Sequence, residues 1–152
     1  MLIQVRQLAT TLLGLSIGLV ICGLATSQWS CGNLFDNCQR GQYKSAVIAV
    51  IALLLFGLVC LMIVLILDTI AFCSDRFSIS SGYVTTRFVF LYLGAASLFV
   101  GILLYTGQIG HTWSYFCATV GCVFALQVAI LAILSSKCVT THERVTVRTV
   151  RA

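Results

Sequence analysis

The sequence predicts an all-α membrane protein folded as a bundle of four transmembrane helices. Two observations support this fold class. Of the 152 residues, 60% are hydrophobic and only 9% are charged, whereas soluble chains average about 25% charged residues. The chain also contains four continuous apolar runs, each close to the roughly 20 helical residues needed to cross a hydrocarbon core about 30 Å thick. The runs lack the alternating pattern of membrane β-strands, so helices are predicted.

The four predicted spans belong to one domain, residues 1–152, because the chain has no repeats or linkers. They cover residues 8–26, 45–72, 88–108 and 113–136. The first run has an alternative interpretation as a secretory signal, since Arg6 precedes it and Ala25 and Ser27 lie near its end. A membrane span is favoured because the run is longer than the roughly 7 to 15 apolar residues of such signals.

The basic residues predict how the bundle is oriented. Residues 27–44 form a loop on one side, whereas the loop 73–87 and the tail 137–152 lie on the other side with both termini. Lys and Arg favour the cytoplasmic side, and only Arg40 and Lys44 of the nine fall in the 27–44 loop. Both termini are therefore expected in the cytoplasm and the 27–44 loop outside a plasma membrane. The net charge of +5 is expected to face anionic membrane lipids rather than nucleic acid.

The eight cysteines divide by their predicted depth. Cys31 and Cys38 fall in the extracellular loop, where the compartment is oxidising, and a disulfide between them is predicted. Cys73 and Cys138 lie at the cytoplasmic ends of the second and fourth spans, where palmitoylation and an unmodified thiol are both open. The others lie within spans as small apolar side chains: Cys22, Cys60, Cys117 and Cys122. No Cys-x-x-Cys pair occurs, so no metal site is predicted.

Small residues recur at helical spacing in three of the spans. Such stripes let helix backbones approach closely, which holds bundles together in lipid. They are expected to seal this bundle, with contact to a partner protein as the alternative. The residues are Gly14 and Gly18 in the first span; Gly94, Ser97 and Gly101 in the third; and Cys117, Gly121, Ala125 and Ala129 in the fourth.

Asp68 and Gln127 are polar residues inside predicted spans. An ionisable group within a membrane is often functional, but Asp68 lies near the cytoplasmic end of its span. Hydration or pairing with Arg76 or Arg87 is therefore the favoured interpretation. Gln127 is expected to hydrogen-bond a neighbouring helix rather than a transported solute. No nucleophile accompanies a base and no phosphate-binding loop occurs, so neither an enzyme nor a cofactor is predicted.

The loop 27–44 carries a recognisable motif, Trp29 followed by Asn33-Leu34-Phe35-x-x-Cys38. It resembles the first extracellular loop of the claudin, peripheral myelin protein and epithelial membrane protein superfamily. Further similarity lies in GILLYTG at 101–107 and HTWSYFCATVGCVFALQVAILAIL at 111–134. The resemblance implies a left-handed four-helix bundle capped by an extracellular sheet. Here the cysteine expected after Cys38 is missing and the loop is short, so the sheet is expected to be small or absent.

Three functions follow as hypotheses. The first is a non-enzymatic protein that organises membrane or cell contacts, as the resemblance implies, through helix packing and a disulfide-stapled cap. The second is an accessory subunit of an ion channel or receptor, and the third and least favoured is a small transporter or pore. The expected partners are membrane lipids and either another membrane protein or a second copy of this chain. The cap residues Trp29, Asn33, Leu34 and Phe35 are expected to anchor the loop rather than to recognise a partner.

Overall fold

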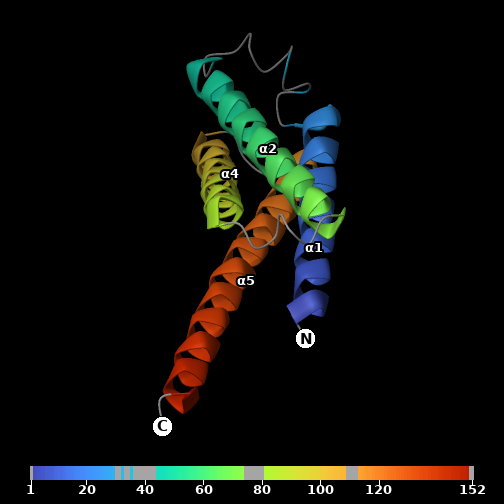
Figure 1. Ribbon diagram of the computed structural model, residues 1–152. Helices are drawn as coiled ribbons and strands as arrows, with labels where there is room; N and C mark the ends of the chain where they lie inside the picture. The colour runs from blue at the N-terminus through green and yellow to red at the C-terminus, as the bar shows by residue number, and fades with distance from the viewer. Residues whose placement is uncertain are drawn as a thin grey trace.

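Four long helices make up nearly all of the chain that the structure describes. The computed structural model describes residues 2–29, 32, 35, 44–73, 81–108 and 113–150. The helices are α1 (Leu2–Ala25), α2 (Lys44–Cys73), α4 (Ser81–Gln108) and α5 (Trp113–Val150) (Figure 1). Each contains a stretch long and apolar enough to cross a membrane: Arg6–Ala25, Lys44–Cys73, Gly82–Gly107 and Trp113–Ser135. The prediction of a helical chain with four helices long and apolar enough to span a membrane is confirmed.

The helices are arranged as two close pairs. α2 packs most extensively against α4, and α1 packs against α5. Smaller interfaces join α4 to α5 and α1 to α2, and among the described residues the backbones of α1 and α4, and those of α2 and α5, do not lie side by side. The order around the bundle is therefore α1, α2, α4, α5. Both ends of the chain lie on the same side, and α5 extends beyond the other helices toward the C-terminus (Figure 1).

Besides α1, which begins at Leu2 and not at residue 8, two helix boundaries differ from those expected. α4 begins at Ser81 and not at residue 88, so part of the expected loop 73–87 is helical. α5 continues to Val150, through most of the expected tail. The expected spans followed apolar runs, and both extensions are polar. Tyr83 and Arg87 in the extra turns of α4 bond to Asp68 of α2, which explains why this polar segment packs onto the bundle.

The helices approach most closely at glycines. A Cβ atom built on Gly57 of α2 would lie 3.0 Å from the carbonyl oxygen of Gly94 in α4. One built on Gly121 of α5 would lie 2.8 Å from Cγ2 of Val20 in α1. Neither position has room for a larger residue without movement. Because lipid provides no hydrophobic force between helices, such close van der Waals packing is what stabilises each pair.

The described residues contain no β-strand. One isolated antiparallel bridge joins Trp29 and Gly32, directly after α1. The Gly32 amide donates to the Trp29 carbonyl at 2.8 Å, and the Trp29 amide donates to the Gly32 carbonyl at 3.2 Å. The φ angle of Gly32 is 95°, a conformation that favours glycine. In the described part of the 27–44 loop, the β element is no larger than this bridge.

Candidate functional site

Trp29 fixes the start of the 27–44 loop against the end of the bundle. Its side chain is only 4% exposed, and its indole Nε1 donates to the carbonyl oxygen of Gly23 at 3.0 Å. The last four carbonyls of a helix have no partner within the helix, and Gly23 lies in this last turn of α1. The Trp29 ring also meets Tyr105 of α4 edge to face, with centroids 4.7 Å apart. Trp29 therefore caps one helix and packs on another.

Residues from α1, α4 and α5 meet around this anchor. The rings of Tyr105 and Tyr115 stack with centroids 5.6 Å apart. The Tyr115 hydroxyl lies 2.6 Å from Oγ1 of Thr106, and Ser114 Oγ donates to the Thr26 carbonyl at 3.3 Å. We call this the Trp29 end of the bundle. These ring and hydroxyl contacts join α4, α5 and the residues after α1 beside Trp29.

The remaining cap residues are only partly described. Phe35 is 47% exposed, so it is not buried over the bundle as Trp29 is. Cys31, Asn33, Leu34 and Cys38 lie outside the described residues, and the disulfide between Cys31 and Cys38 remains a prediction.

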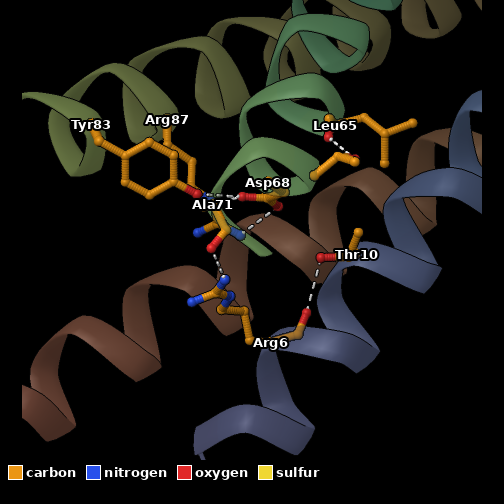
Figure 2. A network of polar contacts seen from close by, with 8 residues as sticks. Arg6, Thr10, Leu65, Asp68, Ala71, Tyr83 and Arg87 are labelled. Carbon is orange, nitrogen blue, oxygen red and sulfur yellow. Dashed lines mark hydrogen bonds and ion pairs between the residues drawn. The ribbon is translucent and has the colours of Figure 1, made fainter. Parts of the chain in front are cut away.

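Asp68 is the centre of a polar cluster at the opposite end, where α2 meets α4 (Figure 2). Its side chain is buried, and Arg87 donates from Nε to Oδ1 at 2.5 Å and from Nη2 to Oδ2 at 3.1 Å. The Tyr83 hydroxyl donates to Oδ1 at 2.9 Å. Of the two interpretations favoured for Asp68, pairing with Arg87 is confirmed. Hydration is not, since the residue is 1% exposed.

Arg6 extends this end of the bundle to α1. Its Nη2 donates to the carbonyl oxygen of Ala71 at 2.8 Å (Figure 2). The guanidinium also lies over the Phe72 ring, 4.4 Å from the centroid. Ala71 is in the last turn of α2, where carbonyls lack helical partners and cations are favoured. Arg6 therefore ties the start of α1 to the end of α2.

The Asp68 cluster holds helices together. Its carboxylate receives three hydrogen bonds from Tyr83 and Arg87, which join α4 to α2. The described residues do not bring three His, Cys, Asp or Glu side chains together where they could hold a metal ion. We interpret the cluster as a three-helix clamp.

Most of the predicted packing residues lie at helix contacts. Gly94 and Gly121 are at the tightest contacts, and Gly101 is in ordinary van der Waals contact with Leu54. Gly14 and Gly18 differ from expectation, because a Cβ built on either would meet no atom within 4 Å. The other predicted residues are buried or partly buried: Ser97, Cys117, Ala125 and Ala129.

Three further packing residues were missed in the sequence. Gly57 faces Gly94 and Leu98, and Gly23 faces Ser114 and Ala118. The Ser16 hydroxyl, fully buried, donates to the Gly121 carbonyl at 2.7 Å. A single glycine in the leucine-rich span of α2 was a signal that could have identified Gly57. The sequence signal for Ser16 was weaker, because Ser16 lies between Gly14 and Gly18 in the sequence but on the opposite face of α1.

The described cysteines are all free thiols. Cys73 is exposed at the end of α2. Acylation requires such exposure, but the exposure does not decide between palmitoylation and an unmodified thiol. The side chain of Cys138 lies outside the described part of α5. The other free cysteines lie within the helices: Cys22, Cys60, Cys117 and Cys122.

Gln127 is exposed on the outer surface of α5. It makes no hydrogen bond to any described residue, so the expected bond to a neighbouring helix of this bundle is not made there.

Comparisons with known proteins give no family for this chain. No protein-family model matches it, and no curated protein matches its sequence. The resemblance of its loop motif to the claudin and peripheral myelin protein superfamily therefore remains a prediction, and function has to be argued from the geometry of the bundle.

Proposed function

We propose that this protein is a non-enzymatic tetraspan protein that organises membrane or cell contacts, in the manner of the superfamily that its loop resembles. In this proposal it lies in the plasma membrane with both termini in the cytoplasm and the Trp29 end outside. The observation that carries the proposal is the anchoring of Trp29 to Gly23 and Tyr105.

Anchoring matters because it brings the start of the loop to a rigid surface. Phe35 follows Trp29 by only six residues and keeps 47% of its surface exposed. Exposed aromatic side chains are enriched where proteins meet. A loop held at its base and presenting an apolar ring is suited to contact with a surface outside the bundle.

The interior of the bundle favours an organising role over transport or catalysis. The described polar or charged side chains that are buried are Ser16, Asp68 and Ser114. Each is hydrogen-bonded inside the bundle, to Gly121, Arg87 and Thr26 respectively. Ser16 and Ser114 lie where α1 meets α5, and Asp68 lies where α2 meets α4, so these buried polar groups are used in joining helices to one another. The role of the packed bundle in this proposal is to hold the loop in position.

The proposal is tested with two cell populations that express differently tagged chains and are then mixed. We expect the protein to concentrate at borders between two expressing cells, and Phe35→Ala to reduce this at an unchanged surface level. Phe56→Ala is the matched control, because Phe56 is also half-exposed but lies on α2 within the membrane span. Uniform distribution of the wild type, or an equal effect of Phe56→Ala, contradicts the proposal.

A second candidate, an accessory subunit of a channel or receptor, is favoured by the outer face of α1. Gly14 and Gly18 lie one turn apart with nothing within 4 Å of their absent Cβ atoms. Glycines at this spacing let a second helix approach closely in lipid. They are not used inside the bundle, so they remain open to a helix of another protein.

Native purification in mild detergent separates the two candidates. An accessory role predicts co-migration with a larger channel or receptor, and loss of co-migration when Gly14→Leu and Gly18→Leu fill the face. Gly107→Leu is the control, since Gly107 in α4 also has open space around it. If the chain migrates alone from native membranes, the accessory role is contradicted.

A further inference from the structure

Gln127 is in an unfavourable position for a chain that functions as a monomer. It lies within the α5 membrane stretch Trp113–Ser135, eight residues before its end and hence about 12 Å into the bilayer along the helix. At that depth lipid offers no hydrogen-bonding groups, and an unpaired amide is costly. The side chain is exposed on the bundle surface and bonds to no described residue.

Several hydroxyl side chains of the spans are satisfied within their own helices. Hydroxyls of Thr69, Thr106 and Thr119 donate to the carbonyl four residues earlier in their own helices. A glutamine carboxamide has two donors and an acceptor, and a helix backbone does not satisfy them. The pairing that Gln127 lacks has to come from outside this bundle.

The surface around Gln127 has the spacing of a helix-packing seam. Exposed or partly exposed residues follow one another at alternating steps of four and three along α5: Phe116, Val120, Val123, Gln127, Ile130 and Leu134. This is the a/d pattern of a left-handed helix pair. A single polar residue at such a position specifies which register and which partner the helix accepts. All other members of this α5 seam are apolar.

We infer that two copies of the chain pair in the membrane through the α5 seam, with Gln127 of one copy hydrogen-bonded to Gln127 of the other. When both copies have the same orientation in the membrane, the two-fold axis runs along the helix pair, and each residue of the seam lies beside its counterpart in the other copy. A carboxamide is complementary to itself, because the carbonyl of each copy accepts from the amide of the other. No charge in the seam opposes this pairing. A lipid tail satisfies the apolar residues but not Gln127.

This inference deepens the proposed function, on which it rests for the membrane location, by naming a second copy as a partner in the same membrane. It also makes the α5 seam distinct from the Gly14 and Gly18 face of α1. Self-pairing on α5 leaves both the loop and α1 free for other contacts.

The test is energy transfer between donor-labelled and acceptor-labelled full-length chains in phosphatidylcholine liposomes. We expect transfer above that of random proximity, rising with the protein-to-lipid ratio. Gln127→Leu is expected to raise the ratio needed for half-association by about 3-fold to 30-fold, the range given by interhelical hydrogen bonds in membranes. Gln127→Asn keeps the carboxamide and is expected to stay closer to the wild type.

A matched pair of variants tests the seam itself. Ile130 in the seam and Ile66 on the lipid face of α2 are exposed to a similar extent, 56% and 54%. Ile130→Trp is expected to weaken pairing, whereas Ile66→Trp leaves it unchanged. Thermal unfolding in detergent should be unaffected by Gln127→Leu, which separates loss of pairing from loss of folding.

Three outcomes of the energy-transfer test overturn the inference. These are transfer no greater than random for the wild type, equal pairing of wild type and Gln127→Leu, and equal weakening by Ile130→Trp and Ile66→Trp. Co-purification of a different membrane protein in a Gln127-dependent manner, with the pure chain monomeric in liposomes, also overturns it and assigns the seam to that protein. The liposome experiment measures pairing within one membrane, whereas the mixed-cell experiment measures contact between cells. Failure of the pairing inference can therefore be distinguished from failure of the proposed contact function.

Discussion

Arg87 of α4 holds Asp68 of α2 with both prongs of its guanidinium, through Nε at 2.5 Å and Nη2 at 3.1 Å. This bidentate geometry orients both side chains, and Tyr83 occupies a further position on the same carboxylate. The pair therefore links the two most extensively packed helices of the bundle at a single buried point.

Removing one partner of this pair should be far more damaging than removing both. Arg87→Met leaves the buried Asp68 carboxylate without its counter-charge, and we expect the free energy of unfolding to fall by about 3–5 kcal/mol. The double variant Asp68→Leu/Arg87→Met replaces the pair by apolar groups and should lie close to the wild type. Reversible unfolding in mixed detergent measures both. A double variant as unstable as Arg87→Met would show that the pair does not act as a unit.

Gly57→Ala should destabilise the α2–α4 pair. The added methyl would lie 2.8 Å from Cγ of Leu98 and 3.0 Å from the Gly94 carbonyl oxygen, and overpacking of this kind destabilises by about 1–3 kcal/mol. Gly14→Ala is the control, since it meets no atom within 4 Å and alanine favours helix formation. The melting temperature in detergent checks both. Equal effects of the two substitutions would argue against close packing at Gly57.

Trp29→Ala should open the Trp29 end of the bundle. It removes the contact with Tyr105 and the hydrogen bond to Gly23, and truncation of a buried aromatic side chain destabilises by about 3–5 kcal/mol. Trp113, the only other tryptophan, is 66% exposed, so Trp113→Ala should change stability little. Urea-induced unfolding in detergent measures the difference, and similar losses from both would contradict the anchoring role of Trp29.

Cys31 and Cys38 should form a disulfide in protein isolated from cells. Peptide mapping without reductant is expected to recover the two cysteines in one linked fragment. Cys22 serves as an internal control, because it is an exposed free thiol with no predicted modification and should react with an alkylating reagent in the same denatured sample. Recovery of alkylated Cys31 or Cys38 would exclude the bridge.

The membrane helices were predictable because long runs of apolar residues are enough to identify them. A span of about 20 apolar residues has few other structures open to it, and all four expected spans correspond to helices. The start of α4 was missed for the same reason. Its first turns contain Thr85, Thr86 and Arg87, and only the buried partner Asp68 explains why such residues join the bundle.

Which face of each helix points inward was harder to predict. In a soluble protein the buried face is apolar and the outer face polar, but in lipid both faces are apolar. Gly14 and Gly121 belong to similar small-residue stripes, yet Gly121 lies against Val20 and Gly14 faces outward. The outward position of Gln127 was missed for the same reason, because the sequence shows its depth but not its direction.

The pairing of α1 with α5 has a consequence for biosynthesis. A ribosome delivers helices in chain order, so α2 and α4 meet as neighbours soon after they emerge. α1 emerges first, but the surface that fits its Ser16 and Gly23 is carried by α5, which emerges last. A chain that stops before residue 113 would therefore leave this face of α1 without the α5 surface that covers it.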